Sequence, residues 1–225
     1  MSTIKPIVLM NEGDIDNNDK AACLDGIREL LSICSVEREI EVIDRGLWRN
    51  IDYKINGVLR KFLSVDWFLK EGWENSRNKT QMNALTILNF LSLPQWKKDN
   101  NYYDVFLLSS DIYYENTNFI IGLARKGVGT IISTNRFQSL NNTLKFECIK
   151  TETMHELGHV FGLLPIDRTE NVDDSLGKHC TNRCIMRQGL IVPIDWVNIT
   201  KDRLKYGPFC ENCKKDLRNY FKLES

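Results

Sequence analysis

The residues with the clearest chemistry in this sequence are its three histidines, which all lie between positions 155 and 179. Two of them, His155 and His159, belong to an H-E-x-x-H motif. Residues four apart lie on one face of an α-helix, so both imidazoles can bind the same metal ion. Glu156 follows the first histidine and can reach a water molecule on that ion. His179 can complete a three-nitrogen site with one open position, the arrangement of a catalytic zinc.

A second candidate metal site begins one residue after His179. It consists of two short-spaced cysteine pairs separated by 25 residues: Cys180 and Cys184, then Cys210 and Cys213. Four thiolates predict a tetrahedral zinc site with no open position, whose role is structural. Disulfides are the alternative, but an odd number of cysteines without an export signal favours a reducing compartment. The remaining cysteines stand singly in apolar segments and are predicted to be core thiols: Cys23, Cys34 and Cys148.

Composition indicates an ordinary globular protein. The 225 residues are 42% hydrophobic and 27% charged, with a formal net charge of zero, so nothing points to a nucleic-acid partner. No apolar stretch approaches the length that crosses a membrane, and the short apolar run near the N-terminus is too short for a secretory signal. We therefore expect a cytoplasmic monomer without a nucleic-acid or membrane partner.

The remaining elements must position these ligands. Apolar runs predict strands at 6–10, 39–43 and 105–108, and a hairpin formed by 118–124 and 129–134. Helical spacing predicts helices at 21–34, 80–91, 144–163 and from 210 onward, whereas 54–78 is not assigned. Gly162 and Pro165 end the helix that carries the histidines. The order predicts an α/β lobe that carries the metal helix, closed from below by a smaller cysteine-rich lobe.

The HELGHVFG stretch, the later His-Cys, the Cys-Ile-Met triplet and the terminal C-x-x-C resemble the archaemetzincins, a branch of the metzincin zinc peptidases. The resemblance is good over about 103–222. It implies a zincin-like α/β (α+β) fold, with a mixed twisted sheet, an active-site helix and a smaller zinc-stabilised C-terminal lobe. Residues 1–225 would form one catalytic domain, with an upper lobe of about 1–163 and a lower lobe of about 164–225. The hairpin of 118–134 would supply the edge strand against which zincins lay an extended peptide.

The resemblance also implies roles for individual residues. His155, His159 and His179 would bind the catalytic zinc, and Glu156 would be the general base. Gly162 would end the metal helix, and Met186 would form the hydrophobic floor of the site. The four cysteines of the second cluster would bind a structural zinc, which gives two zinc ions per chain.

The sequence departs from the family pattern at the third ligand. The metzincin motif places a histidine three residues after the glycine, where this chain has Pro165, and His179 follows Gly162 by 17 residues. We interpret 166–178 as an insertion that loops out and returns, because the entropic cost of closing a loop grows slowly with its length. An acid within the insertion could bind instead of His179: Asp167, Glu170, Asp173 or Asp174. The cysteine spacing from 180 to 184 is also one residue shorter than usual in the family.

The favoured function is a zinc metallopeptidase that hydrolyses peptide bonds in a peptide or protein substrate, through a metal-bound water and the base Glu156. Tyr206 lies in the part of the chain where a second oxyanion donor could be, although a core or surface tyrosine is the simpler interpretation. The first alternative is a non-catalytic two-zinc protein whose C-terminus is a zinc-ribbon-like interaction module. The second is an intact fold that binds zinc without general proteolytic activity.

Overall fold

The computed structural model describes residues 4–47, 53–55, 58–60, 64–175 and 177–221. Its centre is a five-stranded mixed sheet with the order β2-β1-β6-β9-β8. Four strands are parallel, and the edge strand β8 runs antiparallel to β9. The strands are β1 (Ile7–Asn11), β2 (Val42–Gly46), β6 (Tyr103–Leu108), β8 (Gly122–Arg125) and β9 (Gly129–Ser133).

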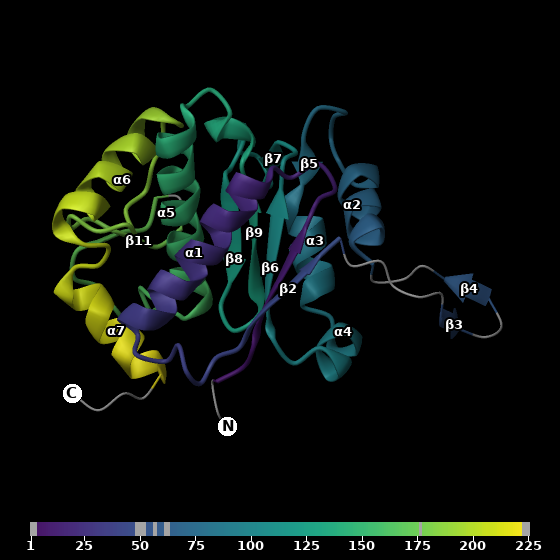
Figure 1. Ribbon diagram of the computed structural model, residues 1–225, viewed down its shortest axis with the longest axis horizontal. Coiled ribbons are helices and arrows are strands. Elements are labelled where there is room, and N and C mark those ends of the chain that lie inside the picture. Colours follow the sequence, from purple (N-terminus) through teal and green to yellow (C-terminus); the bar gives the residue numbers. More distant parts are fainter. Residues whose placement is uncertain (1–3, 48–52, 56–57, 61–63, 176, 222–225) are drawn as a thin grey trace.

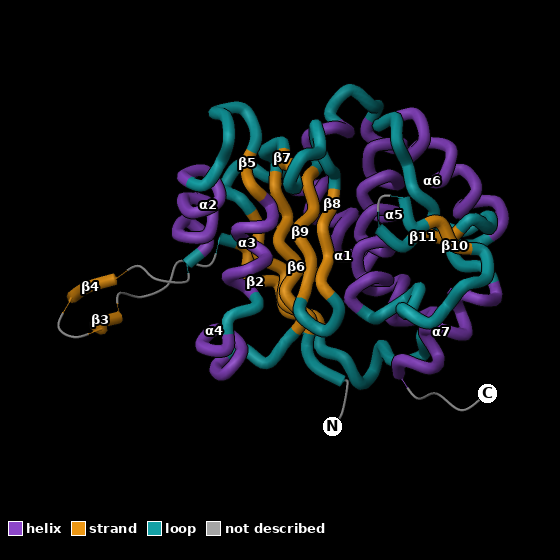
Figure 2. Tube along the Cα trace, turned by 180° about the vertical axis from the view of Figure 1, so that it is seen from behind, coloured by secondary structure: helices purple, strands orange, loops and turns teal. Residues whose placement is uncertain are grey.

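Helices cover both faces of the sheet (Figures 1 and 2). Every residue of the inner strands β1, β6 and β9 is buried, as expected for parallel strands between two helical layers. One face, which includes Leu9 and Val105, packs against α1 (Asn17–Ile33) and α5 (Asn142–Val160). The other, which includes Met10 and Phe106, packs against α2 (Val65–Glu74), α3 (Ala84–Leu91) and α4 (Pro94–Asp99).

The C-terminal part of the chain packs beside α5, at the end of the molecule opposite α2 (Figure 1). It contains a short antiparallel pair, β10 (Val172–Asp173) with β11 (His179–Cys180), and the helices α6 (Ile194–Tyr206) and α7 (Glu211–Phe221). Its buried residues join the same apolar cluster as the sheet face under α1. The division into an upper and a lower lobe stays a prediction, since one apolar core runs through both.

Five short elements complete the fold. They are β3 (Tyr53–Ile55), β4 (Val58–Arg60), β5 (Met82–Asn83), β7 (Ile112–Tyr113) and the 3-10 helix η1 (Asn135–Phe137). The stretch 54–78, unassigned from the sequence, contains α2 and parts of the β3–β4 pair, and some of it lies outside the described residues. In the described parts of the chain, no helix is long and apolar enough to cross a membrane.

The mixed α/β architecture predicted from the sequence is confirmed, with shifted boundaries. The strand expected at 39–43 is β2 at Val42–Gly46, because the chain first makes a turn in which Ile40 N–H donates to the Val36 carbonyl. The helix expected from residue 80 begins only at Ala84, since the Asn83 side chain caps it. The first hairpin strand, expected at 118–124, is confined to Gly122–Arg125. Helix α6 was not predicted at all.

Candidate metal centres and active site

Helix α5 carries the H-E-x-x-H motif through the middle of the molecule. Its N-terminus is capped by the Asn141 side chain, which accepts a hydrogen bond of 3.0 Å from Leu144 N–H. At its other end Gly162 adopts φ +71°, a left-handed conformation that glycine accepts without strain. The Gly127 N–H, at the tip of the β8–β9 hairpin, donates to the Val160 carbonyl at 2.9 Å. Both ends of the helix are therefore fixed.

The two α5 histidines point toward each other. The Nε2 atoms of His155 and His159 are 3.2 Å apart. His155 Nδ1–H donates to the Ile185 carbonyl at 2.7 Å, which leaves its Nε2 with a free lone pair. An imidazole fixed by such a bond is oriented for metal binding.

The structure brings His179 to the same point from β11. Each of the three histidines offers one ring nitrogen, Nε2 or Nδ1, as a metal ligand, and these three nitrogens all lie within 4.8 Å of one another. The His179 ring centre is 5.4 Å from that of His155 and 5.2 Å from that of His159, and its Nδ1–H donates to the Gly177 carbonyl at 3.0 Å. Among the described residues, none of the four acids of the insertion belongs to this cluster: Asp167, Glu170, Asp173 and Asp174.

This donor set fits zinc. Two nitrogens bound to one tetrahedral zinc are about 3.3–3.4 Å apart, close to the 3.2 Å between His155 and His159. Burial lowers the pKa of His159 to about 3 and the pKa of His155 well below its usual value. Burial also lowers the pKa of His179. All three imidazoles are thus neutral near pH 7, the form that binds a metal.

Two buried carboxyl groups lie beside the histidines. Glu156 Oε1 is 4.0 Å from His155 Nε2, and burial raises the pKa of Glu156 to about 8. Glu152, one turn earlier on α5, has no exposed surface. Burial, followed by the negative charge of Glu156, raises the pKa of Glu152 well above its usual value. Neither Glu152 oxygen makes a hydrogen bond of normal geometry with a described residue.

Edge strand β8 passes directly over these carboxyl groups at Gly122. A Cβ atom at this position would lie 2.5 Å from Glu156 Cδ and closer still to the Oε1 atoms of Glu152 and Glu156. Only glycine leaves room for both carboxyl groups at this approach of strand and helix. The carboxyl pair therefore lies between α5 and the edge of the sheet.

Met186 and Trp196 pack against the histidine helix from the C-terminal side. Met186 is fully buried, and a Cβ at Gly158 would lie 2.6 Å from its Sδ, so the second variable residue of the motif must be small. The Trp196 indole packs edge-on to His155 with ring centres 5.2 Å apart. Tyr206 is 52% exposed and packs against Arg183, which favours the surface interpretation of this residue.

The four C-terminal cysteines form the second cluster. Their sulfur atoms lie within 4.8 Å of one another, with Cys180 Sγ and Cys210 Sγ 3.7 Å apart. Thiolates bound to one tetrahedral zinc are about 3.8 Å apart, so these residues also fit the metal. Hydrogen bonds from Cys184 and then Cys213 lower the pKa of Cys180. Cys23, Cys34 and Cys148 are buried and separate from this cluster, as predicted.

Four residues near the two clusters were not identified from the sequence: Gly122, Glu152, Arg168 and Trp196. Glu152 could have been found, because it precedes His155 by three residues and Glu156 by four and so shares their helix face. Gly122 comes from a distant segment, and no motif or helical spacing relates Arg168 or Trp196 to the ligands.

A mixed sheet above an H-E-x-x-H helix, with a third histidine supplied by the segment that follows the helix, defines the zincin class of fold. Within this class the chain belongs to peptidase family M54, whose family model matches residues 75–219, and its relatives are archaemetzincins.

Individual relatives support this membership. The archaemetzincin of Nanoarchaeum equitans is 35% identical over 114 residues, which cover 50% of this chain and 51% of that protein. The archaemetzincin of Archaeoglobus fulgidus is 31% identical over 110 residues, 48% of this chain and 55% of that protein. The chain thus spans about half the length of these two relatives. The archaemetzincin of Saccharolobus islandicus is 28% identical over 203 residues, 86% of this chain and 93% of that protein.

Solved structures show the same fold. The archaemetzincin of Methanopyrus kandleri superposes with a TM-score of 0.64 at 22% identity and covers 98% of this chain and 97% of its own. The archaemetzincin of Archaeoglobus fulgidus, solved in complex with malonate, gives a TM-score of 0.56 at 20% identity and covers 94% and 99%. At these identities the likeness concerns the fold alone.

Proposed function

We propose that this protein is a zinc-dependent metallopeptidase that hydrolyses peptide bonds, with Glu156 as its general base. Membership of a peptidase family supports the zinc peptidase class and a peptide or protein substrate. The observation that carries the mechanism is the position of the Glu156 carboxylate, 4.0 Å from the nitrogen of His155 that faces the other histidines.

His155, His159 and His179 would hold the catalytic zinc. Zinc bound there would polarise the substrate carbonyl and lower the pKa of a bound water from 15.7 to roughly 7. Burial keeps the imidazoles in the neutral form that binds a metal, and the hydrogen bond to the Ile185 carbonyl orients the His155 ring. Met186 would support the histidines from below, and Gly162 would end their helix.

Glu156 would accept the proton of the attacking water at its carboxylate and pass it to the leaving amine. A general base is most effective when its pKa lies near the working pH. Burial moves the pKa of Glu156 in this direction. Edge strand β8 pairs only with β9 among the described strands, so its other edge can bind an extended peptide by strand addition.

The four cysteines would hold a second, structural zinc, giving two ions per chain. A four-thiolate site has no open position for a substrate or water. Structural zinc contributes directly to folding free energy, so this ion would stabilise the C-terminal lobe.

The test is Glu156→Gln, which preserves shape but cannot accept a proton. We expect it to retain zinc and to lose about 10²–10⁴-fold in kcat/KM on a quenched fluorescent peptide that the wild type cleaves. Glu39→Gln is the matched control. Glu39 is exposed and precedes the H-E-x-x-H motif by more than 100 residues, so this variant should have the wild-type kcat/KM. A zinc-loaded Glu156→Gln protein that cleaves at the wild-type rate would exclude Glu156 as the base. A wild type that holds zinc yet cleaves no peptide in a diverse library would exclude the peptidase activity.

A further inference from the structure

Arg168 lies within the insertion but contacts the cysteine cluster. Its guanidinium donates from Nη1 to Cys213 Sγ at 3.4 Å and from Nη2 to Cys180 Sγ at 3.5 Å. Nη1 also donates to Asp216 Oδ2 at 2.8 Å, and the side chains of Arg168 and Asp216 are only 8% and 11% exposed. One guanidinium thus contacts a sulfur from each of the two cysteine pairs, while the mostly buried Asp216 carboxylate fixes its orientation.

The charge of the cluster gives these contacts a role. Four thiolates around a divalent ion carry a net charge of −2, which is costly in a partly buried site unless hydrogen bonds and counter-charge offset it. Arginine suits this position because it is always charged and presents several donors in a rigid plane. Asn182 adds a neutral donor, with Nδ2 3.5 Å from Cys210 Sγ.

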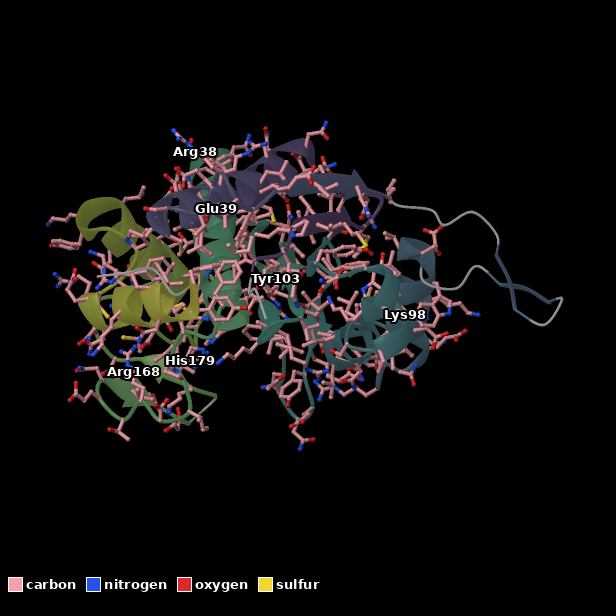
Figure 3. All side chains as sticks on the ribbon, turned by 90° about the horizontal axis from the view of Figure 1, so that it is seen from below. Arg38, Glu39, Lys98, Tyr103, Arg168 and His179 are labelled. Atoms are coloured by element: carbon pink, nitrogen blue, oxygen red, sulfur yellow. The ribbon has the colours of Figure 1, made fainter. Side chains whose placement is uncertain are left out.

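The insertion around Arg168 is tied down at several points. Lys178 Nζ donates to the Pro165 and Ile166 carbonyls at 2.9 and 2.7 Å and so closes the base of the loop. The β10–β11 pairing sets Asp173 opposite His179, and Arg168 Nε donates to the Glu170 carbonyl at 3.1 Å. Figure 3 shows Arg168 and His179 in this same C-terminal part of the molecule.

We propose that Arg168 is a positioning residue that clamps the four-cysteine metal centre and, through it, holds the third histidine in place. The connection is covalent: His179 and Cys180 are neighbours on β11, so whatever fixes the Cys180 sulfur also fixes the strand that presents His179. The insertion that displaces the third histidine along the chain thereby supplies the arginine that anchors it. This inference rests on the proposed structural zinc.

The experiment uses the full-length protein with both sites loaded with cobalt(II), whose sulfur-to-metal charge-transfer band reports on the thiolate centre. Arg168→Gln should shift this band to lower energy, because the sulfurs lose two hydrogen-bond donors. It should also lower metal affinity at the cysteine centre by about 10–100-fold, the usual effect of losing a partner of a metal ligand, and so speed chelator-driven release of the metal. Zinc affinity at the histidine centre should fall as well.

Arg183→Gln is the matched control, because Arg183 lies between Cys180 and Cys184 but pairs with Asp202 at 3.8 Å and packs on Tyr206. It should leave the band and the release rate unchanged. Arg168→Lys should rescue only in part, since one ammonium cannot reproduce the planar fork. If Arg168→Gln does not fold, Asp216→Asn loosens the same guanidinium and should shift the band in the same direction by a smaller amount.

The outcomes separate the two proposals. An Arg168→Gln protein with the wild-type band and release rate would overturn the role of Arg168 while leaving the structural zinc intact. A loosened cysteine centre with unchanged affinity at the histidine centre would overturn the coupling to His179. If the cobalt-loaded wild type shows no thiolate charge-transfer band, both the proposed metal site at the four cysteines and the proposed role of Arg168 are wrong.

Discussion

Replacing Gly122 by alanine offers the sharpest test of the carboxyl arrangement at the site. Gly122 lies on edge strand β8, and its φ is not among the positive values of the chain, so alanine fits the backbone. The new Cβ would lie 2.5 Å from Glu156 Cδ and closer still to Oε1 of Glu152 and Glu156. The substitution therefore acts on the carboxyl groups and leaves the histidines untouched.

The expected size follows from the geometry. Carbon atoms in contact are about 3.5–4.0 Å apart, so the strand and the carboxyl groups must separate by about 1 Å. A displacement of about 1 Å at a catalytic group can cost about 10²-fold in rate. The free energy of unfolding should fall by a small amount, because overpacking costs about 1–3 kcal/mol, while Gly→Ala at a compatible φ recovers about 0.4–1 kcal/mol through the unfolded state.

The measurement is kcat/KM on a cleaved peptide, together with zinc content and urea unfolding. We expect Gly122→Ala to hold its zinc, to remain folded and to lose about 100-fold in kcat/KM. Gly13→Ala is the matched control, because its Cβ would meet the Leu47 side chain at an ordinary 3.5 Å. A fully active Gly122→Ala protein would show that the position of Glu156 beneath β8 is not what catalysis requires, and the proposed mechanism would fail.

Three further predictions concern the metals and a buried acid. His179→Ala should lose zinc from the histidine centre while the cysteine centre keeps its metal, as measured by elemental analysis of the dialysed protein. A mild chelator should remove the histidine-bound ion first without loss of helicity, and removal of the second ion should lower the unfolding temperature. Burial raises the pKa of Asp104 from 3.8 to about 6, a difference worth about 3 kcal/mol. Since protonation favours the folded state, this stability is present below about pH 4 and is lost as the pH rises through 6. Urea unfolding should therefore show wild type losing stability relative to Asp104→Asn between pH 4.5 and 8, and parallel pH profiles would contradict the burial argument.

The sequence predicted the local parts of the site because their spacing is local. Two histidines four apart on a helix must share a face, and the structure brings His155 and His159 together. The cysteine pairs were recognisable for the same reason. The position of His179 beside His155 and His159 depends on the path of residues 166–178. Spacing alone could not decide whether the third ligand is His179 or one of the acids in that stretch.

Contacts between segments that are distant in the chain could not be predicted from the sequence. Gly122 meets the carboxyl pair only because β8 folds over α5, and nothing in the neighbourhood of residue 122 indicates a carboxylate. Helix α6 was missed because its buried face mixes apolar and polar side chains, including Thr200 and Arg203, and therefore lacks an apolar stripe. Arg203 donates to Thr151 and pairs with Glu29 and Glu147, so its burial depends on partners from other helices.

Close packing of α5 explains how the fold can hold two buried carboxyl groups, Glu152 and Glu156, in its interior. Burying such groups costs free energy, and a mobile helix would relieve that cost by turning them toward water. Helix α1 prevents this movement: a Cβ at Gly26 would lie 2.8 Å from the Lys150 carbonyl, so the two helices are in close contact. Lys150 also pairs with Asp25 and Glu29 at 2.7 Å. Packing on the face of α5 that contacts α1 therefore keeps Glu152 and Glu156 beneath the edge strand β8.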